Sequence, residues 1–168
     1  MKKLNVFTAA GGIFVLLLGT AAHFFYDLSG ENFLVGMFSP INESTWEHMK
    51  LAFFPMLLFS VGAQFFLGKE YSGAAAAALC GTLLSTVLIP VIFYTYSGVL
   101  GYNISVLNIL TFVAAVLIGV LTFFRLCKSG AAERFYPMLF AANAAVALLF
   151  FIFTCFPPEI GLFADPTA

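Results

Sequence analysis

The order of apolar and polar residues along the chain predicts five membrane-spanning helices. A spanning helix needs about 20 mostly apolar residues, and uninterrupted apolar stretches of this length recur along the sequence. They cover roughly residues 4–26, 46–67, 73–97, 104–125 and 136–156. We therefore expect an all-α fold, a polytopic membrane helix bundle that forms a single transmembrane domain over residues 1–168. The first apolar run is longer than a typical signal-peptide core, so we expect it to remain as a span.

Composition supports this class and excludes others. Hydrophobic residues make up 62% of the chain and charged residues 9%, whereas a soluble domain has about 45–50% apolar residues. Spans and short connections use nearly the whole length, which leaves no room for a nucleotide-binding or nucleic-acid-binding domain. The expected partner is the lipid bilayer, and the small residues within the spans also allow a homo-oligomer.

The basic residues predict the orientation. If the N-terminus is cytoplasmic, six of the seven Lys and Arg residues lie inside and only Lys50 lies outside. This distribution follows the positive-inside rule. We expect a bacterial cytoplasmic membrane protein whose C-terminus is extracytoplasmic, with most acidic residues on the outer side.

The first outer connection, residues 28–45, holds the apolar segment 33–38. This segment is too short to span a bilayer and too apolar to lie free in water. We expect an interfacial segment, or a lid over the outer mouth of the bundle.

The candidate site lies in residues 39–50, which gather two carboxylates, an imidazole and an ammonium in a very apolar chain. Ionisable groups near a bilayer are costly unless they are paired, hydrated or metal-bound. A helix could begin at Pro40 behind Ser39, or at the Ser44–Glu47 capping box. On a helix that includes Glu43, this residue, Glu47 and Lys50 fall within about 60 degrees, while His48 points about 100 degrees or more away.

Two interpretations of this segment stay open. In the structural one, Glu47 caps the helix, Lys50 pairs with Glu43 or Glu47, and Trp46 anchors at the interface. In the functional one, His23 and Asp27, four residues apart on one helical face, reach the same depth as the start of the second span. The candidate metal ligands are then His23, Asp27, Glu43 and Glu47, a set suited to zinc or another divalent metal.

The same groups could work without a metal, as a proton-coupled site or a general acid/base pair. We assign as candidate catalytic residues His23, Asp27, Glu43, Glu47 and His48. The candidate substrate-binding residues are Tyr26, Asn42, Trp46 and Lys50.

These motifs resemble a family of small bacterial membrane proteins of unknown function. The resemblance rests on His23–Tyr26, Ser29–Gly30, the segment Ser39–Lys50, Pro55 and the tail Thr154–Pro166. It implies the fold and topology but no activity.

Three functions are compatible with the sequence. The preferred one is a membrane-embedded hydrolase or lipid-headgroup-modifying enzyme, with or without a divalent metal. The alternatives are a small transporter or solute-binding subunit, in which Asn42, Glu43, Glu47 and Lys50 hold a solute, and a structural protein whose polar cluster only fixes the fold.

Overall fold

A computed structural model describes residues 1–165 as a helical bundle without strands in that range. The long helices are α1 (Lys2–Ala22), α4 (Thr45–Leu67), α5 (Ala74–Leu100), α6 (Ser105–Ser129) and α7 (Tyr136–Cys155). The shorter ones are α2 (Phe25–Leu28), α3 (Phe33–Gly36) and the single turns η1 (Glu133–Phe135) and η2 (Gly161–Phe163).

Five helices in the described range are long and apolar enough to cross a membrane, which confirms the predicted helical membrane bundle. Their bounds agree with the predicted spans to within four residues, and one of the largest differences is that α1 ends at Ala22 rather than near residue 26. At this point Phe24 N donates to Ala21 O, 3.0 Å away, and the chain turns before the short α2 begins.

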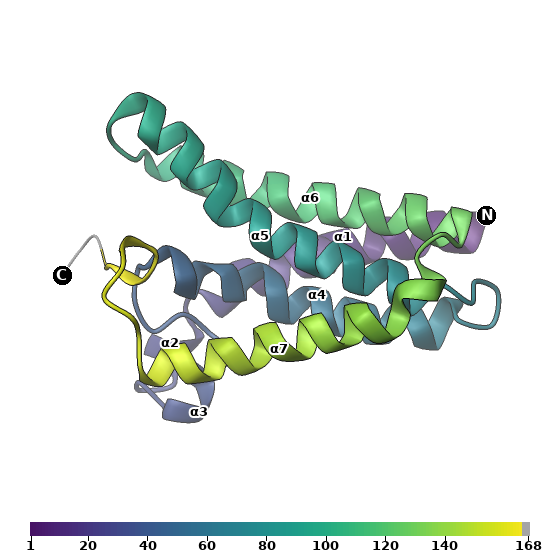
Figure 1. The fold of residues 1–168 in the computed structure, drawn as a ribbon, viewed down its shortest axis with the longest axis horizontal. Coiled ribbons are helices and arrows are strands. Elements are labelled where there is room, and N and C mark those ends of the chain that lie inside the picture. The colour runs from purple at the N-terminus through teal and green to yellow at the C-terminus, as the bar shows by residue number, and fades with distance from the viewer. Residues whose placement is uncertain (166–168) are drawn as a thin grey trace.

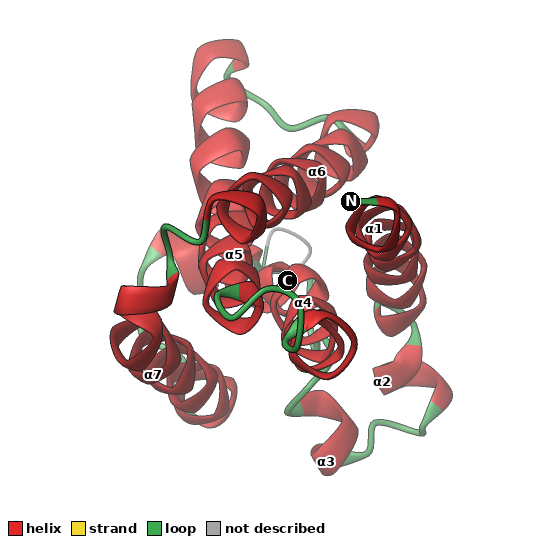
Figure 2. Ribbon diagram, turned by 90° about the vertical axis from the view of Figure 1, so that its right-hand side faces the viewer, coloured by secondary structure: helices red, strands yellow, loops and turns green. Residues whose placement is uncertain are grey.

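Helices α4 and α5 form the centre of the bundle (Figure 2). About half of each span is buried, 56% in α4 and 50% in α5, compared with 17% in the span that contains α7. Helix α1 packs on α4 and α6, and α7 packs mainly on α5. Exposed apolar side chains on α1, α6 and α7, and on parts of α4 and α5, are available to lipid.

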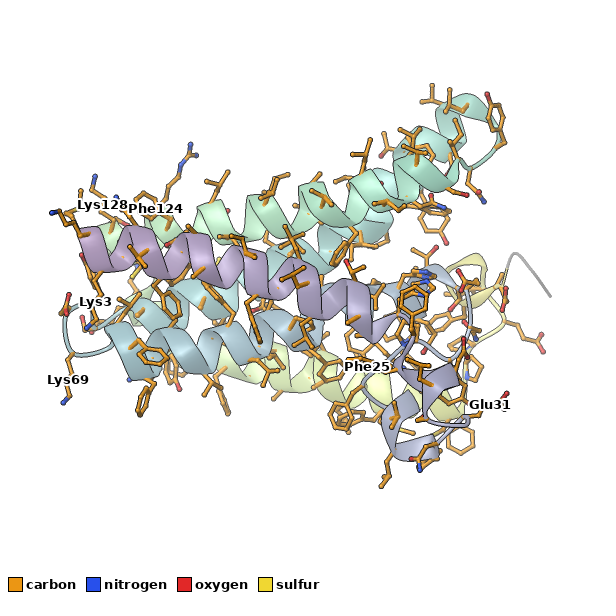
Figure 3. All side chains as sticks on the ribbon, turned by 180° about the vertical axis from the view of Figure 1, so that it is seen from behind. Lys3, Phe25, Glu31, Lys69, Phe124 and Lys128 are labelled. Atoms are coloured by element: carbon orange, nitrogen blue, oxygen red, sulfur yellow. The ribbon has the colours of Figure 1, made fainter. Side chains whose placement is uncertain are left out.

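The chain ends and the charged residues divide between two ends of the bundle. The N-terminus lies at one end and the C-terminal segment at the other (Figure 1). Lys3, Lys69 and Lys128 lie together at the N-terminal end, which we call the basic end, and Glu31 lies at the opposite end (Figure 3). We call the opposite end the site end; it holds His23, residues 29–44 and residues 156–165.

The apolar segment after the first span forms α3, with Phe33 and Leu34 more than 60% exposed. Phe38 packs its ring against Phe54 of α4 and Phe151 of α7. Figure 1 shows α3 on the side of the bundle away from the α5–α6 turn. An interfacial position remains our prediction for this segment.

Close packing at Gly19 places the end of α1 beside α4. A Cβ atom at Gly19 would lie 2.4 Å from Leu51 O and 2.6 Å from the Phe112 ring. We expect Gly19→Ala to lower the free energy of unfolding by about 1–3 kcal/mol, because an added methyl group must push α1 away. Gly98→Ala is the matched control, since nothing lies within 4 Å of a Cβ there.

Thermal unfolding of both variants in detergent measures this effect. A Gly19→Ala protein as stable as the wild type and Gly98→Ala would show that α1 does not pack this closely on α4.

Candidate metal centre at the site end

The chain before α4 folds through its own polar side chains. Asn42 Oδ1 accepts a hydrogen bond from Ser44 N at 3.0 Å, and Ser44 Oγ accepts one from Glu47 N at 3.3 Å. Ser44 is thus the N-cap of α4, which confirms the second of the two predicted helix starts. The first, at Pro40, is wrong, because residues 39–44 form an irregular, bent segment before the helix.

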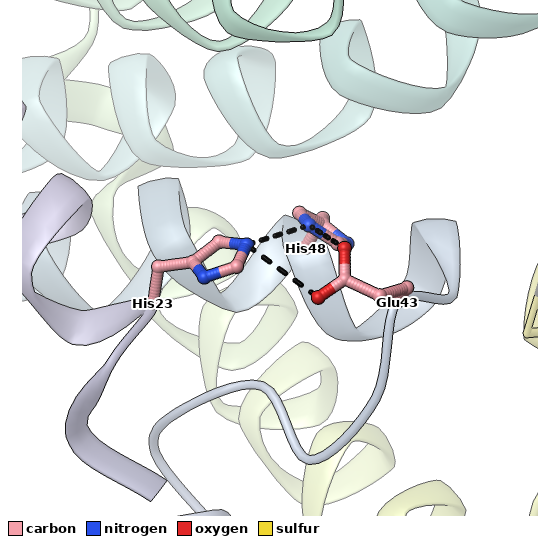
Figure 4. Close-up of side chains that lie close together, drawn as sticks. All are labelled: His23, Glu43 and His48. Carbon is pink, nitrogen blue, oxygen red and sulfur yellow. Dashed lines mark hydrogen bonds and ion pairs between the residues drawn. The ribbon is translucent and has the colours of Figure 1, made fainter. Parts of the chain in front are cut away.

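Because α4 begins at Thr45, Glu43 lies outside the helix and does not follow its periodicity. The prediction that His48 points away from Glu43 is therefore wrong. His48 Nε2 lies 3.4 Å from Glu43 Oε2, and His23 Nε2 lies 3.7 Å from Glu43 Oε1. The two histidine Nε2 atoms are 3.3 Å apart. Figure 4 shows the three side chains converging from the end of α1, the turn before α4 and the first turn of α4.

The proton on His48 can be placed from its other ring nitrogen. His48 Nδ1 lies 2.9 Å from Ser44 O, and a carbonyl oxygen only accepts, so Nδ1 carries the hydrogen. In a neutral ring, Nε2 then presents a lone pair to His23 Nε2 and to the Glu43 carboxylate. This lone pair can accept a hydrogen from His23 Nε2 or bind a metal ion.

The spacing of this group, which we call the His23–Glu43–His48 cluster, suits a metal. Ligand atoms about 2.0–2.1 Å from a tetrahedral zinc ion lie roughly 3.3 Å from one another. The separations of 3.3 and 3.4 Å match this value. The backbone hydrogen bond to His48 Nδ1 is also the usual outer partner of a metal-binding histidine.

The cluster leaves room for a further ligand. The side chains of His23, Glu43 and His48 are 35%, 47% and 28% exposed. Two histidines and one glutamate form a set found in catalytic zinc sites, in which water takes the fourth position.

The structure does not bring Asp27 into the cluster. The prediction that His23 and Asp27 share one helical face is wrong, because α1 ends before His23 and Asp27 lies exposed on the separate α2. The turn at residues 23 and 24 interrupts the helix, and the apolar pattern of the sequence did not predict this interruption.

Glu47 and Lys50 form a second, buried group. Lys50 Nζ donates to Glu47 Oε2 at 2.6 Å and to Thr154 Oγ1 at 2.6 Å, with both ionic side chains at most 3% exposed. The sequence left Glu43 and Glu47 open as the partner of Lys50, and the structure shows that the partner is Glu47. Glu47 therefore faces Lys50 and not the His23–Glu43–His48 cluster, and Lys50 faces the interior.

This buried pair also holds the connection that carries Glu43. Lys50 Nζ donates to Gly36 O at 2.8 Å, and Glu47 Oε2 accepts from Ile41 N at 3.0 Å. The pair thereby joins α4, α7 and residues 36–41. The Glu47–Lys50 pair therefore holds residues 36–41 in place, a few residues before Glu43.

The other predicted substrate-binding residues have structural contacts. Tyr26 lies against Gly36, and Asn42 forms the turn before α4. Trp46 is 7% exposed and packs its ring on Phe150 and Phe163, so it lies in the core rather than at an interface.

A cavity of about 460 Å³ opens beside the cluster, and sequence reasoning did not predict it. Glu43 and His48 contribute to its wall, together with the site ends of α5 and α6 and the C-terminal segment. Asn108 and Thr111 also line it. Among the described residues, its lining does not include Tyr26, Asn42, Trp46 or Lys50.

Comparison with known proteins gives a family and no activity. Neither the curated proteins nor the solved structures contain a significant match to this chain. A family model described as "Family of unknown function (DUF6512)" matches residues 2–168. The resemblance to an uncharacterised family is thus confirmed, and the chain belongs to this family of unknown function over nearly its whole length.

Proposed function

We propose that this protein is a membrane-embedded, metal-dependent hydrolase that acts on a lipid substrate. The observation that carries the proposal is the convergence of His23 Nε2, His48 Nε2 and the Glu43 carboxylate beside a cavity. A divalent cation such as zinc in this position supplies a water of lowered pKa and a Lewis acid for a carbonyl or phosphoryl oxygen.

The residues of the chain have separate roles in this proposal. His23, Glu43 and His48 hold the cation, and Ser44 O fixes the His48 ring through Nδ1. Glu47 and Lys50 position the connection before Glu43 and do not touch the substrate. Asp27 has no role in metal binding.

The substrate comes from the bilayer because the site lies at the end of the spans. We propose that the site end faces the extracytoplasmic side of a bacterial cytoplasmic membrane, since the basic residues gather at the opposite end. A lipid then reaches the cavity from the outer leaflet.

A transporter is less well supported. Between residues 51 and 67 of α4, and throughout α5 and α7, the sequence contains no Asp, Glu, Lys, Arg or His. Transporters commonly place their coupling groups near the bilayer midplane. In this chain the ionisable groups lie at the ends of the spans.

Incubation of the purified protein with a bacterial total-lipid extract tests the proposal. Mass spectrometry should show lipid products that correspond to addition of water, and chelation of divalent metal or Glu43→Gln should abolish them. Asp27→Asn makes the same change from carboxylate to amide outside the cluster and should retain them. Products that persist in Glu43→Gln, or no product from any lipid in the extract, would contradict the proposal.

A further inference from the structure

The cavity beside the cluster has an almost entirely neutral wall. Its lining residues are Glu43, Thr45, His48, Leu51, Ile89, Phe93, Tyr94, Asn103, Ser105, Asn108, Thr111, Phe112, Gly161 and Ala164. Apart from Glu43 and His48, these side chains are neutral, and no Lys or Arg is among them.

The rest of the site end supplies no free cation either. The sequence contains seven Lys and Arg residues, and of these only Lys50, in the first turns of α4, lies toward the site end. Lys50 is fully buried, and its Nζ donates to Glu47, Thr154 and two backbone carbonyls. It therefore cannot reach a ligand in the cavity without breaking the buried group.

This charge distribution separates two kinds of hydrolysis. Phosphoryl transfer spreads negative charge over several oxygens, and enzymes commonly stabilise it with Arg, Lys or more than one metal ion. Hydrolysis of an acyl ester or amide develops one negative charge on one oxygen, which a single cation and a neutral donor can stabilise. The neutral wall of the cavity, together with one cation held by His23, Glu43 and His48, would match the second arrangement.

The neutral wall provides such a donor and an apolar surface. Asn108 lines the cavity, and because its Oδ1 accepts from Tyr96 Oη, its amide hydrogens are not used in that hydrogen bond. Leu51 and Ile89 are 6% and 5% exposed and form an apolar part of the wall with Phe112. Tyr94 Oη donates to Gly161 O at 3.0 Å, which ties the C-terminal segment to α5 at this site.

Building on the proposed function, we propose that the cavity binds an uncharged lipid by its acyl ester and that this ester is the bond hydrolysed. The oxygen of water bonds to the acyl carbon, and the bond between this carbon and the alcohol oxygen breaks. One hydrogen of the water stays with the acid and the other passes to the alcohol, so no oxidant or reductant is needed. The volume of about 460 Å³ accommodates the ester and the first part of an acyl chain.

A binding experiment without turnover tests this inference. Radiolabelled dioleoylglycerol and dioleoylphosphatidic acid carry the same chains and differ in the phosphate. The protein used is detergent-purified Glu43→Gln, which keeps the size of the side chain but cannot complete the cluster. For this protein we expect the Kd of dioleoylglycerol to be about tenfold lower than the Kd of dioleoylphosphatidic acid. Asn108→Lys in this background should strengthen binding of the phosphatidic acid by about tenfold, because it adds the missing cation.

A matched pair of variants locates the binding. Ile89→Trp fills the apolar part of the cavity and should weaken binding of dioleoylglycerol by about tenfold or more. Val91→Trp, at a position on the same helix that is 51% exposed and does not line the cavity, should leave it unchanged. Size-exclusion chromatography shows that each variant is folded.

The outcomes separate the two proposals. Tighter binding of the phosphatidic acid by the parent Glu43→Gln protein, no effect of Asn108→Lys, or equal effects of the two tryptophan variants would overturn the inference. Preference for dioleoylglycerol in a protein whose wild type carries no metal would support the binding site and overturn the metal-dependent hydrolase.

Discussion

Lys50→Met should lower the free energy of unfolding by about 3–5 kcal/mol, because it leaves the Glu47 carboxylate buried without its cation. Both side chains are almost completely inaccessible, and Lys50 Nζ lies 2.6 Å from Glu47 Oε2. Removal of the ammonium also takes a donor from Thr154 Oγ1 and from the carbonyl of Gly36. Equilibrium unfolding in mixed detergent measures the loss.

Two control variants show how much of the stability loss in Lys50→Met comes from the burial of the ion pair and how much from the unpaired charge. Lys3→Met makes the same substitution in the Lys3–Glu70 pair, whose side chains are 51% and 48% exposed. An exposed pair contributes about 0–1 kcal/mol, so this variant should change little. The double variant Glu47→Gln, Lys50→Met removes both charges and should recover part of the stability lost in Lys50→Met. A Lys50→Met protein as stable as Lys3→Met would show that the buried pair does not support the fold.

Glu43→Gln should reduce bound divalent metal from about one ion per chain to a small fraction, because an amide is a much weaker metal ligand than a carboxylate. Glu43 is the only carboxylate in the cluster of described residues that could hold a metal. His48→Ala should have the same effect, since it removes the Nε2 atom that the hydrogen bond to Ser44 O orients. Elemental analysis of the purified variants measures the bound metal.

Asp27→Asn is the matched control for Glu43→Gln, because sequence reasoning assigned both carboxylates to one metal site and the structure separates them. Retention of metal in Asp27→Asn with loss in Glu43→Gln supports the cluster. The reverse pattern would restore the ligand set expected from the sequence and contradict the one proposed from the geometry.

The sequence was sufficient for the bundle because long apolar runs leave few alternatives to spanning helices. Its predicted alternatives also included Ser44 as the cap of the second span and Glu47 as the partner of Lys50, since both are interactions between residues three apart at the start of one helix. Interactions of this kind depend on local geometry alone.

The composition of the site depended on features that periodicity does not determine. A helix start at Thr45 placed Glu43 beside His48, and a helix end at Ala22 separated His23 from Asp27. Thr154, which completes the buried group, follows Lys50 by more than a hundred residues. The cavity arises where α5 and α6 diverge from α4 and the C-terminal segment, and no local pattern indicates such a space (Figure 1).

The measurement that tests the central claim most directly is elemental analysis of the detergent-purified wild-type protein beside His23→Ala. His23 follows α1, whereas Glu43 and His48 lie at the start of α4, so the contribution of His23 depends on the fold rather than on the local motif. The account predicts about one divalent metal ion per wild-type chain and a small fraction of this in His23→Ala. A wild-type protein that carries no more metal than His23→Ala would contradict it, and shared protons would then hold the three side chains together.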